Sequence, residues 1–478
     1  MTNRSGTRSL TPAEQQLLSQ PLTLPFSGRV IKNRFLKAAL SESLARPDGQ
    51  IDKSHTNNLV NLYEAWAKGG SGLILTGNIM VDRLHREMER NVAVEDERDI
   101  GRLKLWAGAV HKHGAALVAQ ISHPGRQSHG HLTRNPVAPS AVPVSNFHPL
   151  MTFAPPRALT EQEIKSLVQS FTTTAVVLSN AGFDGIELHA AHGYLISQFL
   201  NPRTNIRTDS YGGSLENRAR FLSEIVQSIR AATPASFIVG VKLNSVDFGR
   251  RRGDNNKDEA SSQEGDNGVD KDLEEAVQVS VMLENLGVDF IEISGGSYES
   301  FAAGLLDGKG VPNTDPASDP TRSARSRQRE AHFAVFADKI SSALTKTKVV
   351  LTGGFLSAVA MADAVKGENE EGAETTVMVA DGGKPHIDMV GLGRTICQEP
   401  DLPNLVMTGS VTGALTMPKT PGGFMDIVFL CGGNLHRLAA KKTPVTSLGG
   451  MLFSPAHYGF GFDYTKVGVH KIKTLVGC

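Results

Sequence analysis

One helix–strand unit stands out in residues 160–190, which read TEQEIKSLVQSFTTTAVVLSNAGFDGIELHA. Thr160 and Glu163 have the spacing of a capping box, and the apolar residues that follow recur every three or four positions, as in an amphipathic helix. Gly182 suits the end of such a helix, because glycine adopts the left-handed backbone often found there. The short run Gly185–Leu188 is typical of a buried strand. The stretch therefore predicts a helix over residues 160–181 and a strand directly after it.

The same alternation continues along most of the chain. Eight short runs, largely apolar and rich in β-branched residues, are separated by helical patterns; they are Phe35–Ala39, Gly72–Thr76, Ala116–Ile121, Gly185–Leu188, Phe237–Leu243, Phe290–Ile293, Val349–Thr352 and Met389–Gly391. Eight strand–helix units predict an α/β fold in the form of a closed (β/α)8 TIM barrel. An open, doubly wound sheet is the alternative, but no strand is followed by Gly-x-Gly-x-x-Gly.

Stretches without this alternation set the expected boundaries. We place the barrel in residues 29–405, with an N-terminal segment, 1–28, and a C-terminal extension, 406–478, packed against it. Within the barrel, residues 250–272 include 12 charged residues and little apolar surface, so they predict a flexible surface insertion. Residues 304–329 and 366–386 are rich in Gly, Pro, Asp or Ser and are expected to project from the barrel rim.

Composition excludes several classes of protein. Lys plus Arg and Asp plus Glu both number 49, and a net charge of zero argues against a nucleic-acid partner. Three cysteines are too few for a disulfide framework or a four-cysteine metal site. The sequence has neither a secretory signal nor an apolar run long enough to span a membrane, so we expect a soluble cytoplasmic protein without a membrane partner. The oligomeric state is left open.

Two predicted strand ends have the residues of a phosphate site. Catalytic and binding residues of barrels lie at the C-terminal ends of the strands, and the phosphate site often follows the last two. Gly353 and Gly354 follow the seventh strand, and Gly393 and Arg394 follow the eighth. Backbone N–H groups can approach an anion where no side chain intervenes, and arginine adds a planar pair of donors. Together these positions predict a phosphorylated ligand.

The fourth predicted strand ends in GIELHAAHGY, which supplies His189, His192 and Tyr194. Two imidazoles can donate hydrogen bonds to one carbonyl oxygen and stabilise negative charge on it. A nearby phenol can then deliver a proton. A pair of structural histidines and a metal site are the alternatives, but the position at a strand end favours the catalytic interpretation.

Five stretches form a recognisable pattern along residues 20–405. They are Asn33-Arg34, AQISHPGRQS (119–128), GFDGIELHAAHGYLISQFLNPRTNIRTDSYGGSLENRARF (182–221), TGGF (352–355) and VGLGRTICQEPDLPN (390–404). In these motifs and in their order, the chain resembles the old yellow enzyme family of flavin oxidoreductases. It is most similar to fungal members described as NADH:flavin oxidoreductases.

The resemblance implies one FMN bound across the C-terminal mouth of the barrel and a ping-pong reaction. NAD(P)H reduces the flavin and leaves, and the flavin then reduces the C=C bond of an α,β-unsaturated carbonyl compound, as in an ene-reductase. Carried over by position, Gln120 is implied to hydrogen-bond the flavin pyrimidine edge, and Lys242 to lie near flavin N1 and O2. The phosphate is implied to be held by Gly353, Gly354, Gly393 and Arg394.

The resemblance also implies the roles of the strand-four residues. His189 and His192 bind the substrate carbonyl oxygen, and Tyr194 protonates the carbon alpha to it while flavin N5 gives hydride to the beta carbon. A redox-neutral isomerase or a dehydrogenase on the same FMN barrel is an alternative. More distant alternatives are a metal-dependent barrel hydrolase using His123, His189 and His192, and a binding or scaffold protein without activity.

The chain departs from the family pattern in several places. Lys242 stands where many relatives carry Arg, which keeps the charge but not the two-pronged geometry. Ser41 stands where relatives often have Thr or Cys beside flavin O4, so we expect a different redox potential. The first strand ends in KAALS (37–41) in place of a Pro-containing version, which leaves Ala39 at the flavin-contact position. The physiological substrate and the choice between NADH and NADPH are left open.

Overall fold

The computed structural model describes residues 4–144, 152–244, 267–294, 336–366, 387–416 and 424–445. Within these ranges, residues 267–272 and 424–429 are described by their backbone alone. The predicted stretch 304–329 and nearly all of 366–386 lie outside the described residues.

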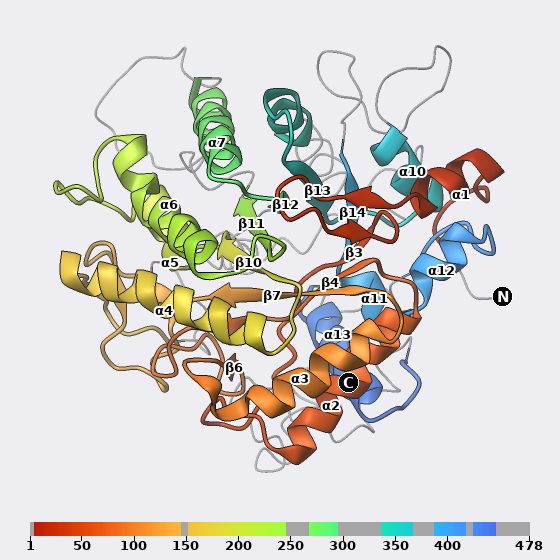
Figure 1. The fold of residues 1–478 in the computed structure, drawn as a ribbon, viewed down its shortest axis with the longest axis horizontal. Coiled ribbons are helices and arrows are strands. Elements are labelled where there is room, and N and C mark those ends of the chain that lie inside the picture. The colour runs from red at the N-terminus through yellow and green to blue at the C-terminus, as the bar shows by residue number, and fades with distance from the viewer. Residues whose placement is uncertain are drawn as a thin grey trace, which may run out of the picture.

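Eight parallel strands close into a ring at the centre of the molecule (Figure 1). In ring order they are β3 (Phe35–Lys37), β4 (Leu73–Leu75), β7 (Ala116–Ser122), β10 (Gly185–Ala190), β11 (Ile238–Asn244), β12 (Phe290–Ser294), β13 (Lys348–Thr352) and β14 (Met389–Leu392). The ring closes because β14 pairs in parallel with β3, and β7 with β10. The predicted (β/α)8 barrel is therefore confirmed, and each strand lies within two residues of its predicted bounds.

Helices surround this ring (Figure 1). The larger ones between strands are α2 (Lys53–Lys68), α3 (Ile100–His111), α4 (Glu161–Asn180), α6 (Leu215–Ala232), α7 (Asn267–Asn285) and α10 (Ala358–Lys366), and residues 336–343 are also helical. The predicted helix over residues 160–181 is α4. Its capping box is present, with Glu163 N donating to Thr160 Oγ1 over 3.2 Å, and Gly182 after its end has a φ of +88°.

Shorter strands and helices lie in the segments that connect these elements. The strand segments are β1 (Leu22–Thr23), β2 (Val30–Ile31), β5 (Ile79–Met80), β6 (Val92–Ala93), β8 (Val137–Ala138) and β9 (Arg157–Ala158). The short helices are η1 (Glu97–Asp99), η2 (Gly125–Gln127), α5 (Leu195–Leu200), α11 (Arg394–Gln398) and α12 (Leu402–Met407). No helix within the described ranges combines the length and the apolar composition needed to cross a bilayer.

The barrel interior at the amino ends of the strands is apolar. Inward side chains of seven strands pack together there, and the β1–β2 hairpin covers them; the cluster includes Leu22, Leu24, Ile31, Leu36, Leu73, Val118, Ile238, Phe290, Val350 and Met389. Gly240 makes room for the Phe290 ring, since a Cβ at position 240 would lie 2.2 Å from it. A larger apolar cluster fills the space between the strands and the outer helices. The polar residues of the interior are therefore confined to the other end of the strands.

Both terminal regions lie against outer helices where they are described. Helix α1 (Pro12–Ser19) contacts α10 and α12, and Arg4 forms an ion pair with Glu399. Helix α13 (Phe424–Ala439) contacts α2 and α11, and Asn61 Nδ2 donates to Ala439 O over 2.9 Å. Figure 1 shows α13 beside α2 although the two come from opposite ends of the chain.

The insertion predicted at residues 250–272 was given too late an end. Residues 267–272 form the start of α7, because Val269 precedes Leu273 and Ala276 at helical spacing, so the apolar pattern of the sequence extends back into the charged stretch. The remainder of the predicted insertion, residues 250–266, lies outside the described residues.

Candidate active site

The carboxyl ends of β7, β10, β11 and β12 bring four polar side chains into one buried layer. Strand pairing places Glu187 beside Gln120, His189 beside Lys242, and Lys242 beside Glu292. Gln120 Nε2 donates to Glu187 Oε2 over 2.6 Å, and Lys242 Nζ donates to Glu292 Oε1 over 2.9 Å. Gln120 and Lys242, two of the residues predicted from the sequence to contact the flavin, therefore belong to this polar layer.

The surroundings shift the two carboxyl groups of the layer in opposite directions. Burial and the neighbouring Glu292 charge raise the pKa of Glu187 well above its usual value. Burial also opposes ionisation of Glu292, but the Lys242 ammonium outweighs it and lowers the pKa of Glu292. Glu187 Oε1 and Glu292 Oε2 are both buried without a hydrogen-bond partner among the described residues. Sequence reasoning missed both acids, although a single Glu inside an apolar strand was a signal.

His189 and His192 are brought together above this layer. The distance from His189 Nε2 to His192 Nδ1 is 3.0 Å, and His192 Nε2 lies 3.1 Å from Ser294 Oγ. The His192 backbone donates to Asn244 Oδ1 and has a φ of +58°, a left-handed conformation rare outside glycine and held here by that bond. Burial and neighbouring cationic groups lower the pKa of His192 to about 3 and that of His189 well below its usual value. Both imidazoles are therefore neutral at physiological pH.

A chain of hydrogen bonds fixes which nitrogen of each imidazole carries the proton. Asn78 Nδ2 donates to Glu87, so Asn78 Oδ1 is the atom that faces His189 Nδ1, 2.8 Å away. His189 Nδ1 must then be the donor, which leaves Nε2 to accept from His192 Nδ1. The His192 Nε2 atom accepts in turn from Ser294 Oγ. Every bond of the chain points from Ser294 toward the Glu87 carboxyl.

Tyr194, the predicted proton donor, contacts the same carboxyl. Its hydroxyl donates to Glu87 Oε2 over 2.9 Å, and its ring packs edge-on to His189 with 4.6 Å between centroids. Ser41 Oγ donates to Glu87 Oε1 over 2.6 Å. Burial raises the pKa of Glu87, which is 3% exposed. Sequence reasoning missed Glu87, because it lies within RLHREMER (83–90), a charged run that looks like any solvated loop.

The predicted phosphate residues follow β13 and β14 at the same end of the barrel. Gly353 and Gly354 have φ values of +117° and +79°, which glycine adopts without strain. A Cβ added at Gly353 or Gly393 meets no atom of the described residues within 4 Å, so this part of the chain leaves room beside both glycines. Arg394 is exposed, and Ala39 and Ser41 at the end of β3 are half-buried.

Lys37 on β3 is a further buried charge that sequence reasoning did not assign. Its Nζ donates to Leu75 O over 2.8 Å and lies 4.1 Å from the centroid of the Trp66 ring. Burial lowers the pKa of Lys37 to about 8. Nearby, the buried Glu42 accepts from Gly77 N over 2.8 Å and from the Tyr63 hydroxyl. These contacts bind the ends of β3 and β4 together beside the mouth.

His123 does not join His189 and His192. In the described part of the chain, the one group of three potential metal ligands is Asp82, His85 and His123, whose ligand atoms lie within 4.8 Å of one another. Asp82 Oδ2 is 2.6 Å from His85 Nδ1, a hydrogen-bond distance, whereas two ligands of a tetrahedral zinc lie roughly 3.3 Å apart. Burial opposes ionisation of Asp82, but the two imidazoles outweigh it and hold its pKa below the usual value. The ligand set of the metal-hydrolase alternative is therefore not assembled.

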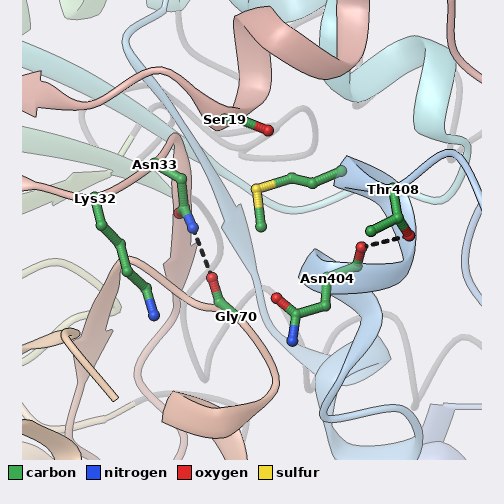
Figure 2. A pocket seen from close by; sticks show the side chains of 7 residues that line it. Ser19, Lys32, Asn33, Gly70, Asn404 and Thr408 are labelled. Carbon is green, nitrogen blue, oxygen red and sulfur yellow. Dashed lines mark hydrogen bonds between the residues drawn. The ribbon is translucent and has the colours of Figure 1, made fainter. Parts of the chain in front are cut away.

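A separate cavity of about 420 Å³ lies at the amino ends of the strands, away from the histidines (Figure 2). Figure 2 shows Asn33 Nδ2 donating to Gly70 O, over 2.7 Å, and Lys32 Nζ donates to His113 O over 2.8 Å. These bonds join the start of β3 to neighbouring segments, so they serve the fold. The lining residues are Ser19, Lys32, Asn33, Gly70, Asn404, Met407 and Thr408.

Comparison with known proteins gives one family. Residues 18–284 match the model described as the NADH:flavin oxidoreductase / NADH oxidase family. The chain is 37% identical to the NADH-dependent flavin oxidoreductase nadA of Aspergillus parasiticus, covering 90% of this chain and 87% of that protein. It is 34% identical to the NADH-dependent flavin oxidoreductase iliE of Hypocrea jecorina, covering 81% and 88%. A solved 2-naphthoyl-CoA reductase, in complex with 2-naphthoyl-CoA, has the same fold, with a TM-score of 0.65 at 22% identity and coverage of 92% and 58%.

The chain therefore belongs to the NADH:flavin oxidoreductase / NADH oxidase family, which confirms the family that the motifs indicated. It is an oxidoreductase with FMN as its cofactor and NAD(P)H as its hydride donor. The mouth of the barrel fits such a cofactor. Among the described residues, no atom crowds Gly353 or Gly393, and Asn244 Nδ2 is buried at the mouth without a partner.

Proposed function

We propose that the protein is an ene-reductase, which reduces the C=C bond of α,β-unsaturated carbonyl compounds. The observation that carries the proposal is the grouping of His189, His192 and Tyr194 at the carboxyl end of β10, with both imidazoles neutral and the phenol in contact with His189. Bound FMN supplies the chemistry of accepting hydride from NAD(P)H and returning it to a second substrate.

Eight residues are proposed to hold the cofactor. Gly353, Gly354, Gly393 and Arg394 bind its phosphate, because the glycines leave room for close approach of backbone N–H groups. Gln120 and Lys242 contact the polar edge of the ring system from the buried layer, and the Lys242 ammonium offsets negative charge that builds there. Ala39 and Ser41 contact it from the end of β3.

His189 and His192 bind and polarise the substrate carbonyl. Adding hydride to the beta carbon leaves negative charge on the carbonyl oxygen, and neutral imidazole N–H groups stabilise it without a metal ion. One donor of this kind lowers the barrier by about 3–4 kcal/mol. Tyr194 then gives its phenolic proton to the alpha carbon, which completes net addition of two hydrogens across the bond.

The test is an anaerobic stopped-flow experiment on the purified holoenzyme that follows flavin absorbance. NADH or NADPH is mixed first, and 2-cyclohexenone second. We expect bleaching by the nicotinamide and rapid return of the oxidised spectrum with the enone, accompanied by cyclohexanone in the product analysis. Bleaching that the enone does not reverse contradicts the ene-reductase proposal and leaves the family assignment intact. Isomerised enone without net consumption of nicotinamide indicates the redox-neutral alternative.

A further inference from the structure

Glu87 is a buried carboxyl group on which donors from three other segments converge. Ser41 follows β3, Asn78 follows β4 and Tyr194 follows β10, and all three donate to its two oxygens. The charged side chain that acts on Glu87 most is another carboxyl, Glu42, which disfavours a second negative charge. An acid that has no cationic partner among the described residues, and that contacts the phenol assigned to proton donation, is an unusual feature for a purely structural residue.

The loop that carries Glu87 is fixed by its own hydrogen bonds. It runs from β5 to β6, and β5 pairs with the end of β7. Arg86 Nη2 donates to Pro47 O over 2.7 Å, Arg83 Nε donates to Glu95 Oε2 over 3.1 Å, and Met88 N donates to Asn91 Oδ1 over 2.6 Å. Because hydrogen bonds fix the residues on either side of Glu87, its carboxyl group is held in place at the mouth of the barrel.

The charge of Glu87 affects what Tyr194 can do. A carboxylate 2.9 Å from the phenol opposes loss of the phenolic proton, because two negative charges then lie side by side. A protonated carboxyl has the reverse effect, since it can donate to the phenol oxygen as that oxygen gives up its own proton. The titratable groups facing Glu87 are Tyr194 and Glu42, with His189 beyond Asn78.

The charge of Glu87 also affects His189 through Asn78. With Glu87 as a carboxylate, Asn78 donates to it and receives the His189 Nδ1 proton, which leaves Nε2 as an acceptor. A substrate oxygen needs a donor at His189 Nε2. In that tautomer His189 Nδ1 carries no proton and must accept a hydrogen bond. The Asn78 amide can donate this bond only if it rotates, so that its Nδ2 faces His189 and its oxygen faces Glu87. Glu87 can donate a hydrogen bond to the rotated Asn78 oxygen only when Glu87 itself carries a proton.

We propose that Glu87 is the positioning residue of the proton-donating machinery: its one acid proton is held on the rotated Asn78 oxygen, which lets His189 Nε2 donate to the substrate oxygen, and it passes to Tyr194 once the phenol has lost its own proton. This inference rests on the proposed function, because it assigns Tyr194 and His189 the roles given there. The bonds that Glu87 accepts from Ser41, Asn78 and Tyr194 are those of a carboxylate, whereas burial disfavours its charge, so uptake of one proton is the step that switches the Asn78 amide.

The proton steps balance as follows. The Tyr194 O–H bond breaks as a C–H bond forms at the alpha carbon, and the electron pair for reduction comes from the NAD(P)H-reduced cofactor. The Glu87 O–H bond breaks as the Tyr194 O–H bond forms again. The Glu87 carboxylate then takes a proton from water by way of the half-buried Ser41 hydroxyl.

The first test compares Glu87→Gln with the wild-type holoenzyme in the two half-reactions over a range of pH. The amide keeps the size of the side chain but cannot pass on a proton. We expect flavin reduction to change less than twofold and reoxidation by the enone to slow at least tenfold. The wild-type reoxidation rate should fall as pH rises through the Glu87 pKa, and this limb should be missing in the variant. The matched control is Glu399→Gln, a buried carboxyl paired with Arg4, which should leave both half-reactions unchanged.

The second test does not depend on activity. NMR of ring-labelled tyrosine, with Tyr194→Phe to assign the signal, measures the pKa of Tyr194 in the wild-type and Glu87→Gln proteins. Removing a carboxylate next to the phenol should lower that pKa by about one unit or more. An unchanged Tyr194 pKa, or equal slowing of both half-reactions, overturns the role of Glu87. If instead the wild-type enzyme is not reoxidised by the enone, the proposed function fails while the NMR titration still decides whether Glu87 controls Tyr194.

Discussion

The two halves of the barrel interior are built by the same strands but contain opposite kinds of side chain. On β12, Phe290 belongs to the apolar cluster, and Glu292, two residues later on the same face, belongs to the polar layer. On β7, Val118 and Gln120 show the same change over the same distance. The lower half, at the amino ends of the strands, buries apolar surface. The upper half, at the carboxyl ends, buries charged side chains, some of which repel one another. The residues that stabilise the barrel and the residues that form the site therefore lie at opposite ends of the same strands, rather than on different strands.

The largest effect is expected in the lower half. Phe290→Ala leaves a cavity beside Gly240 and should lower the free energy of unfolding by about 3–5 kcal/mol, measured by denaturant unfolding. The rate of flavin reduction per folded molecule should stay within about twofold. The exposed Leu105→Ala is the control and should change stability by no more than about 0.5 kcal/mol. A large loss of rate in folded Phe290→Ala protein contradicts the separation of the two halves.

In the upper half, the largest effect concerns rate. Tyr194→Phe should slow reoxidation of the reduced enzyme by 2-cyclohexenone by about a hundredfold or more, because the general acid is lost. Reduction by NAD(P)H should change less than about threefold. Stopped-flow absorbance measures both rates. Tyr211→Phe, which removes a buried tyrosine hydroxyl bonded to Glu224, is the matched control and should leave both rates unaltered. Equal loss in both half-reactions excludes Tyr194 as the proton donor.

The upper half should also make stability depend on pH. His189 and His192 have pKa values below that of an unfolded histidine, about 6.5, so the unfolded chain binds their protons first. Their contribution to stability is complete above pH 6.5 and is lost as pH falls toward 3. Between pH 7 and pH 5.5, the wild-type protein should lose roughly 2–3 kcal/mol that the double variant His189→Asn, His192→Asn does not lose.

An opposite control sharpens this measurement. Asp184 raises the pKa of His111, so the stability that His111 contributes is present below pH 6.5 and is lost as pH rises through its folded pKa. His111→Asn should therefore change the pH dependence of unfolding with the opposite sign. If the double variant shows the same loss at low pH as the wild-type protein, the two site histidines are not buried as neutral groups.

Much of the barrel could be predicted from local patterns. The eight strands, the capping box at Thr160 and the placement of His189, His192 and Tyr194 after one strand all depend on residues close together in the sequence. Local patterns could not show which acidic residues belong to the site. Glu187 and Glu292 are charges within apolar strands, a local signal that the sequence analysis did not use, but Glu87 lies among several charged neighbours, and nothing local distinguishes it from them.

The amino-acid sequence by itself determined the (β/α)8 barrel, the family and the end of the barrel where chemistry occurs, because periodicity and strand-end position are local properties. Only the tertiary structure decided which groups meet. Ser41, Asn78, Glu87 and Tyr194 come from four separate segments, and closure of the ring brings their polar atoms to one carboxyl. The physical reason is that hydrogen bonds and pKa shifts depend on distances of a few ångströms, which are set by packing across the barrel.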